Sequence, residues 1–227
     1  MSKWYDPNEE GLCVWAAYQP FDAASFAASL IDISGNGNNA IDPGGANTPD
    51  WSTGVGWQFD GIQQYLTTTF VPAADQGQSM IIQFSDAGIG AASALAGMVD
   101  AADRRFEIWN SEGSVGARYS NGAFVEIGPE MVSGNLSIAG NQGYRNGVAD
   151  GGAIAGWGGA AASTVYIGCS SIFGIPILFT DAHIQALAIY NCALASTQVG
   201  DIADSLDSLV SGLGDGGGAH RLWNQDE

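Results

Sequence analysis

Short β-prone runs recur along this chain at fairly even intervals, and most are followed by residues that favour a tight turn. The turns include Asn121-Gly122, Asn146-Gly147 and Asp150-Gly151, and the chain holds 33 glycines in all. The expected strands cover residues 12–18, 56–59, 65–70, 79–84, 94–99, 105–109, 115–119, 123–127, 135–139, 142–145, 164–167 and 182–190. A tight, hydrogen-bonded turn is expected between residues 30–33 and 40–41. No repeat of 20–50 residues is visible, so this spacing predicts a β-sandwich and excludes a solenoid or propeller.

One amphipathic helix is predicted over residues 196–213. Apolar residues recur there at intervals of three and four, which places them on one face of a helix, and three aspartates fall on the opposite face. The apolar positions are Val199, Ile202, Ala203, Leu206, Leu209, Val210 and Leu213, and the aspartates are Asp201, Asp204 and Asp207. Ser196 can cap the start, and Gly214 favours the end. We expect a single domain over residues 1–214.

Residues 215–227 are expected to form a glycine linker and a C-terminal tail. The tail carries His220, Arg221 and Trp223, an unusual combination for a terminal segment without contacts. We expect these three residues to contact a neighbouring subunit, the alternative being a tail that packs on its own domain.

The charge balance restricts the partners. The chain has 24 acidic and 6 basic residues, a net charge of −18. Nucleic acid and anionic membranes are therefore poor partners, because both are bound chiefly through lysine and arginine. No apolar run approaches the roughly 18 residues of a membrane span. The charge itself is most simply explained by solubility.

The termini and the cysteines bear on where the protein works. Residues 1–7 lack a basic segment followed by an apolar one, so no secretory signal is predicted there. Cys13, Cys169 and Cys192 are odd in number and show no metal-ligand spacing. We expect buried free thiols, with a Cys169–Cys192 bridge as the alternative in an oxidising compartment.

Five segments, in chain order, resemble the laminin G-like domains of the concanavalin A-like lectin/glucanase superfamily. Residues 31–40 (IDISGNGNNA) resemble the opening D-x-S-G-N-G-N-x-G, and residues 57–61 with Tyr65 resemble F-D-G-x-x-x-Y. Residues 143–147 (GYRNG) resemble a Y-x-N-G hairpin. Residues 165–168 (VYIG) and 184–194 (IQALAIYNCAL) resemble the closing strands. The departures are Ala40 for glycine, Gln185-Ala186 for an acidic residue and Cys192 for arginine.

This resemblance implies an all-β, two-sheet antiparallel jelly-roll sandwich, followed here by the C-terminal helix. It also implies a structural calcium ion near the rim of the sandwich. Calcium takes six to eight oxygen ligands, and the matching loops offer Asp32, Asn36, Asn38 and Asp60. The alternative is that these side chains only cap turns, as Asp and Asn commonly do.

Relatives in the same superfamily include glucanases, so catalysis has to be considered. Retaining hydrolysis needs two carboxylates about 5–5.5 Å apart, which on one strand face means acids at alternate positions. The nearest pattern runs from Glu107 to Glu112, but Trp109 stands where the middle carboxylate is needed. His183 has Asp181 nearby but no nucleophile on a G-x-S-x-G turn. We therefore expect no enzymatic activity.

Two non-catalytic functions remain. Stacking aromatics with neighbouring amides would bind glycans, and the candidates are Trp109, Tyr119, Tyr144, Trp157 and Asn146. The low charge content, the tail and the missing signal favour a virion surface protein, such as a phage head-decoration or tail-associated adhesin subunit. Its partners would be other virion subunits or copies of itself, with host glycans as a further ligand. The alternative is an extracellular, calcium-assisted lectin-like module.

Overall fold

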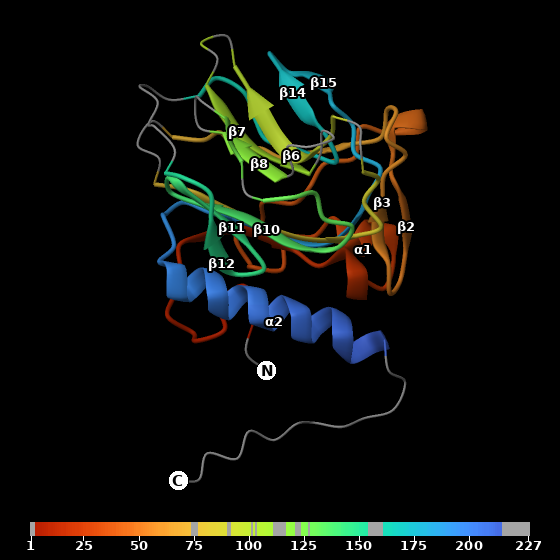
Figure 1. Cartoon of the computed structure of the whole chain (residues 1–227). Helices are drawn as coiled ribbons and strands as arrows, with labels where there is room; N and C mark the ends of the chain where they lie inside the picture. The colour runs from red at the N-terminus through yellow and green to blue at the C-terminus, as the bar shows by residue number, and fades with distance from the viewer. Residues whose placement is uncertain are drawn as a thin grey trace, which may run out of the picture.

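The computed structural model describes residues 3–73, 77–89, 92–100, 102, 104–110, 117–120, 124–126, 128–153 and 161–214. Side chains of residues 117–120, 124–126 and 213–214 are outside the description. Within it the chain forms two stacked β-sheets with one long helix against the outer face of one sheet (Figure 1). Helices shorter than this one are η1 (Pro20–Asp22), α1 (Phe26–Ser29) and η2 (Gly45–Asn47). Among the described helices, none has the length and apolar character to cross a membrane.

Sheet I lies on the side of the long helix. Its order is β12-β11-β10-β5-β16-β3-β2, and β1 pairs with β16 as well. The strands are β1 (Val14–Tyr18), β2 (Asp50–Ser52), β3 (Gly56–Gln58), β5 (Ser79–Ser85), β10 (Gly134–Ala139), β11 (Gln142–Arg145), β12 (Val148–Asp150) and β16 (His183–Tyr190). The strand pairs described in this sheet are antiparallel, and β5 and β16 at its centre are almost completely buried.

Sheet II forms the opposite layer, with the order β15-β14-β6-β7-β8-β9. Its strands are β4 (Leu66–Thr67), β6 (Ala94–Val99), β7 (Arg105–Asn110), β8 (Ala117–Ser120), β9 (Phe124–Glu126), β13 (Tyr166–Ile167), β14 (Ser170–Ile172) and β15 (Ile175–Ile177). Strand β13 joins β4 to β6. The predicted two-sheet sandwich is confirmed. The pair β14–β6 is parallel, however, so the sandwich is not purely antiparallel, and the jelly-roll order of strands stays a prediction.

The core fills the space between the sheets. Alternate residues of each strand point inward, as the two-residue period of a strand requires. Sheet I contributes Met80, Ile82 and Phe84 from β5, and sheet II contributes Ile108 and Ile167 among others. The opposite face of sheet I is apolar too, and α2 (Ser196–Gly214) covers it with Val199, Ile202 and Leu206. The predicted helix is confirmed, and it ends one residue later than expected.

Residues 30–41 form the predicted hydrogen-bonded turn, in which the Ala40 N–H donates to the Leu30 carbonyl (2.9 Å). Residues 30–33 are not a strand, because the Asp32 carboxylate organises the backbone into a loop. Its oxygens accept N–H groups from Ala17, Ser34 and Asn38, at 2.9–3.0 Å. Ile31 and Ile33 remain half exposed, which a buried hairpin strand would not allow.

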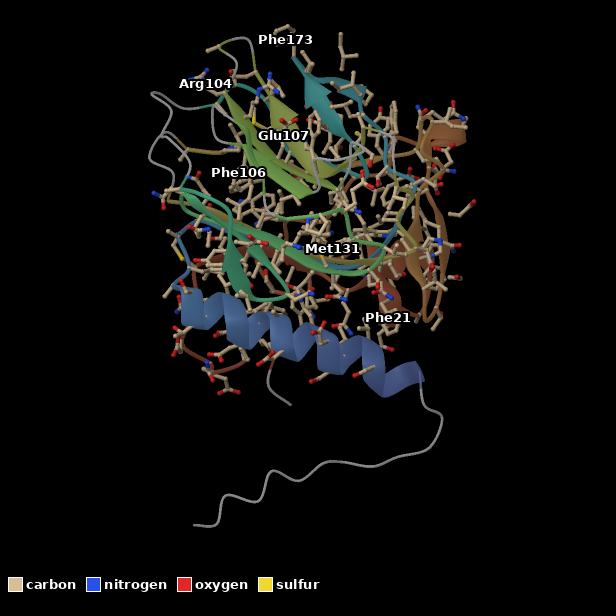
Figure 2. All side chains as sticks on the ribbon, in the orientation of Figure 1. Phe21, Arg104, Phe106, Glu107, Met131 and Phe173 are labelled. Atoms are coloured by element: carbon tan, nitrogen blue, oxygen red, sulfur yellow. A yellow bond between two sulfur atoms is a disulfide. The ribbon has the colours of Figure 1, made fainter. Side chains whose placement is uncertain are left out.

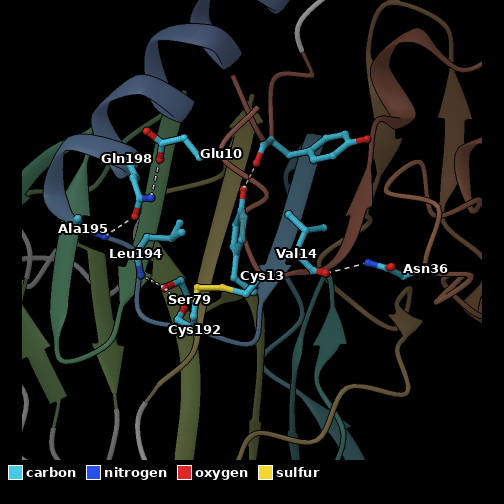
Figure 3. Close-up of a disulfide and its surroundings, with 11 residues drawn as sticks. Glu10, Cys13, Val14, Asn36, Ser79, Cys192, Leu194, Ala195 and Gln198 are labelled. Atoms are coloured by element: carbon cyan, nitrogen blue, oxygen red, sulfur yellow. Dashed lines mark hydrogen bonds between the residues drawn. A yellow bond between two sulfur atoms is a disulfide. The ribbon is translucent and has the colours of Figure 1, made fainter. Parts of the chain in front are cut away.

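The cysteine prediction is wrong for two of the three residues. Cys13 and Cys192 form a disulfide across 179 positions of sequence, with their Cα atoms 5.9 Å apart (Figure 3). Cys169 alone is a buried free thiol, and burial raises its pKa. The bridge joins the segment before β1 to the connection between β16 and α2. Ser79 supports the same connection by donating to the Cys192 carbonyl (2.8 Å) and accepting from the Leu194 N–H (3.0 Å).

Candidate functional site

The residues proposed for calcium serve the loops in which they lie. The Asp32 carboxylate accepts hydrogen bonds from three backbone N–H groups. The amides of Asn36 and Asn38 donate to the carbonyls of Val14 and Trp15, at 2.8 and 2.6 Å. Among the described residues there is no cluster of three or more His, Cys, Asp or Glu side chains suited to a metal. These contacts favour the turn-capping interpretation of this loop.

Asp60, the fourth proposed ligand, caps a separate turn. One of its oxygens accepts the N–H groups of Ile62, Gln63 and Gln64, at 2.9–3.1 Å. Burial raises the pKa of this carboxyl, but the backbone N–H groups outweigh that effect and bring the pKa below its usual range. Asp60 therefore stabilises the turn that leads into Tyr65. The calcium prediction itself stays a prediction.

The structure does not bring the proposed glycan-binding residues together. Tyr144 is 3% exposed on the outer face of sheet I, where its hydroxyl meets the Ser196 hydroxyl at 3.0 Å. Asn146 is exposed, but its side chain accepts the Asn135 N–H within the β11–β12 turn (3.0 Å). Trp109 is 7% exposed on sheet II. The Tyr119 side chain, Trp157 and the tail residues His220, Arg221 and Trp223 lie outside the described residues.

A row of residues crosses the outer face of sheet II. Backbone register places Tyr166, Gly97 and Glu107 side by side on β13, β6 and β7. Their neighbours Ile167, Met98 and Ile108 belong to the core, so the row points away from it. Figure 2 labels Glu107 within this layer.

Gly97 makes room for the Glu107 side chain. A Cβ at position 97 would lie only 2.7–2.8 Å from Glu107 atoms, so no other residue fits there without a shift. Glu107 thus lies flat across β6, fully buried, and accepts a hydrogen bond from Ser170 on β14. The Arg105 guanidinium lies 3.8 Å from its other oxygen. This carboxylate fastens β7 to β14.

An aromatic platform occupies the same face beside this row. We use the name for Tyr65, Tyr166 and Phe179, which come from the start of β4, from β13 and from the segment after β15. The rings of Tyr65 and Tyr166 are stacked with centroids 5.5 Å apart, and Phe179 lies 6.3 Å from Tyr65. All three residues are partly exposed. Burial raises the pKa of Tyr166, with smaller contributions from Tyr65 and Cys169, so its hydroxyl stays protonated at neutral pH.

The β14–β15 hairpin adjoins the platform. The Tyr166 hydroxyl donates to the carbonyl of Gly174 at the hairpin tip (2.9 Å). The two turn residues, Phe173 and Gly174, both have positive φ, +55° and +79°. This is the conformation of a type I′ turn, for which Asn-Gly is preferred. Phe173 is nevertheless 61% exposed there and stands out at the edge of the molecule (Figure 2).

A cleft of about 670 Å³ lies elsewhere, between the N-terminal segment and α2. Trp4 and Tyr5 line it but are only 8% and 5% exposed, and they pack edge to face 5.5 Å apart. The Trp4 indole donates to the Gln19 amide (2.9 Å), and the Tyr5 hydroxyl donates to the Ile33 carbonyl (2.8 Å). These groups hold the N-terminal segment on the sandwich, so the platform offers the more accessible aromatic surface.

The residues of the platform could be found only partly from sequence. Tyr65 and Tyr166 both lie in segments that resemble laminin G-like motifs, so the sequence indicates the fold at these positions and not a binding site. Phe179 lies in no such segment. What unites the three is a pairing between strands about 100 positions apart, Thr67 with Tyr166, which no local pattern reveals.

Comparison with protein-family models and with curated proteins yields no match. Solved structures do match. Trypanosoma rangeli sialidase in complex with the inhibitor DANA has a TM-score of 0.59 at 17% identity, over 87% of this chain and 33% of the sialidase. Domain 4 of AbnA, an extracellular arabinanase from Geobacillus stearothermophilus in complex with arabinotriose, has 0.59 at 16% identity, over 85% and 98%.

The botulinum neurotoxin serotype G binding domain has a TM-score of 0.56 at 11% identity, over 85% of this chain and 51% of that domain. This chain spans about a third of the sialidase and nearly the whole of the arabinanase domain. At these identities the likeness concerns architecture alone. This chain shares the β-sandwich fold of these domains.

Proposed function

We propose that this chain is a non-catalytic glycan-binding module of the concanavalin A-like, laminin G-like type, and that the aromatic platform is its binding surface. The single observation that carries the proposal is the partly exposed stack of Tyr65 and Tyr166 with Phe179 beside it. The C–H faces of a sugar ring pack on such side chains, and a tyrosine hydroxyl adds a polar group at the ring edge. Partly exposed aromatic rings are therefore suited to a saccharide.

The position of the platform in the fold supports this proposal. It lies on the outer face of sheet II, whereas α2 lies against the outer face of sheet I (Figure 1). A ligand can thus approach the platform without displacing the long helix. The fold neighbours supply a parallel, since the arabinanase domain is named in complex with arabinotriose.

The proposal excludes hydrolysis, because glycoside hydrolases generally use two carboxylates on opposite sides of the scissile bond. Glu107 lies in the same row as Tyr166, and it is fully buried with Ser170 and Arg105 as partners. In that position it supports the sheet and has no path to a sugar on the surface.

The Cys13–Cys192 disulfide supports an extracellular location. Disulfides persist in oxidising compartments and are rare in the cytosol. The disulfide therefore favours the lectin-like module over a virion subunit that assembles in the reducing interior of a cell.

A virion surface subunit is the second candidate, favoured by the apolar residues displayed at one tip of the molecule. Phe173 and Ile175 are 61% and 65% exposed on the β14–β15 hairpin. Exposed apolar residues that lie together often mark a protein–protein interface. Sedimentation velocity distinguishes the two candidates. A discrete oligomer that lacks glycan affinity would support the structural role, and a monomer that binds glycans would support the module.

The direct test is a glycan array followed by titration calorimetry on the best hit. We expect Tyr166→Ala and Tyr65→Ala each to weaken binding about tenfold, since a stacked ring contributes roughly 0.5–1.5 kcal/mol. Phe26→Ala is the matched control, because Phe26 is a partly buried aromatic on α1, far from the platform in sequence and on a different element. Equal affinity in all variants would refute the platform. Chelator in a parallel titration reports whether calcium assists.

A further inference from the structure

The β14–β15 hairpin carries a bulky residue in a conformation that does not suit it. Phe173 adopts a φ of +55°, in the left-handed region where a side chain of this size is a rare outlier. Asparagine would fit the same turn better. Phe173 is also 61% exposed, so the hairpin gains little burial in return. Backbone strain that does not stabilise the fold indicates that Phe173 has a functional role.

The hairpin tip is fixed relative to the platform. The Tyr166 hydroxyl bonds to the Gly174 carbonyl (2.9 Å), and the Phe173 N–H bonds to the Val99 carbonyl on β6 (3.0 Å). Phe173 therefore projects from a turn that is anchored on both β13 and β6. Such a turn holds an aromatic wall beside the platform with little loss of freedom on binding.

The hairpin side of this site is uncharged. Residues 151–180, which include β13, β14 and β15, contain no Asp, Glu, Lys, Arg or His, although the whole chain carries a net charge of −18. The arginines of the neighbouring strand face buried carboxylates: Arg104 lies 2.6 Å from Asp100, and Arg105 lies 3.8 Å from Glu107. Carboxylate and sulfate groups are bound chiefly by available arginine and lysine, and a strongly negative protein repels them.

We propose that Phe173 forms one wall of the binding site and that the site takes uncharged glycans, not sialylated, uronate-bearing or sulfated ones. This inference rests on the proposed function and adds the ligand class and a specificity-determining residue. The platform supplies the stacking surface, and the uncharged hairpin excludes ligands that require a cation.

The first experiment compares matched ligands on the wild-type protein. Neutral arabino-, gluco-, galacto- and manno-oligosaccharides are titrated beside their carboxylated or sulfated counterparts. We expect the acidic member of a pair to bind at least about tenfold more weakly. The affinity for the neutral member should stay constant between about 0.05 and 0.5 M salt, because no ion pair forms. A preference for the acidic member overturns the ligand class and leaves the glycan-binding function standing. No binding to either class overturns both.

The second experiment isolates Phe173. Phe173→Asn keeps the turn, because asparagine readily adopts positive φ, so the variant should fold at least as stably as the wild type. We expect its affinity for the best neutral glycan to fall about tenfold. Val148→Asn is the matched control, since Val148 is 70% exposed on β12 of the opposite sheet, and it should leave the affinity unchanged. An unaltered affinity of Phe173→Asn, with thermal stability preserved, overturns the role of Phe173.

Discussion

Replacing both Cys13 and Cys192 with serine removes a cross-link that closes most of the chain into one loop. The bridged residues are 179 positions apart. In the loop-entropy treatment, a loop of about 180 residues restricts the unfolded chain by about 18 cal/mol/K, or about 5 kcal/mol at 25 °C. Native disulfides commonly contribute about 2–5 kcal/mol when removed, so this bridge belongs at the upper end of that range.

Urea denaturation measures this quantity directly. We expect the free energy of unfolding to fall by about 4–5 kcal/mol in the double variant, with the midpoint of thermal unfolding about 10 °C lower for a chain of this length. Wild-type protein in reductant is the matched control and should unfold like the double variant. The slope against urea should rise slightly, because the uncross-linked chain exposes more surface.

Two results would contradict this expectation. A change below about 1 kcal/mol would mean that the unfolded chain is not restricted as the loop length implies. Thiol titration of the denatured, unreduced protein gives the second check. One reactive thiol, Cys169, is expected per chain, and three would mean that the bridge is absent.

Three further predictions concern the sandwich itself. Gly97→Ala should cost about 2–3 kcal/mol by thermal denaturation, because the new Cβ meets Glu107, whereas Gly152→Ala, with nothing within 4 Å, should change little. Asp32→Ala should lower the free energy of unfolding by about 3 kcal/mol, because it leaves three backbone N–H groups without their acceptor. Calcium should not raise the melting temperature of the wild-type protein. A rise that this variant abolishes would restore the calcium interpretation. Burial acts to raise the pKa of Asp100, but the Arg104 guanidinium and three backbone N–H groups outweigh it and lower that pKa, so the stability that the carboxylate contributes is present above the unfolded pKa of about 4 and is lost as the pH falls through the folded value. Urea titrations from about pH 2 to 7 should show a smaller acid loss for Asp100→Asn, and an unchanged pH profile would contradict the assignment.

Much of the secondary structure could be predicted from local pattern. Strand β6 occupies the predicted range Ala94–Val99, and β11 occupies Gln142–Arg145, since both are bounded by turn residues. Helix α2 follows from an apolar period that no strand could satisfy. These elements are long enough, or clearly enough delimited, for a short window of sequence to specify them.

Shorter edge elements escaped prediction for physical reasons. Strand β15 contains Pro176, which cannot donate to a ladder and is tolerated at a sheet edge, so Ile175–Ile177 lacks the appearance of a strand. Strand β14 begins with two buried serines, Ser170 and Ser171, and Ser170 donates a hydrogen bond to Glu107 on β7. Tertiary contact, not propensity, decides these segments.

The candidate site was harder still. The sequence predicts Trp109 and Tyr144 as stacking residues, yet both are buried, because an aromatic on a sheet face serves packing as readily as binding. The Cys13–Cys192 pair likewise depends on β1 lying beside the end of β16, which spacing between cysteines cannot reveal. The residue types are visible in the sequence, but which of those residues lie together depends on the pairing of distant strands.

The described ends of the chain also determine how the domain can be presented to a ligand. The segment that begins at Lys3 and the end of α2 both lie on the sheet I side, opposite the layer that holds β6, β7 and β14 (Figure 1). A support or a fused partner attached through either end would leave the platform facing outward. Immobilised copies would then display parallel, unobstructed surfaces, and a repetitive polysaccharide could engage several of them at once. Because linked weak contacts act at high effective concentration, a domain with modest affinity for one saccharide would hold such a polymer far more firmly.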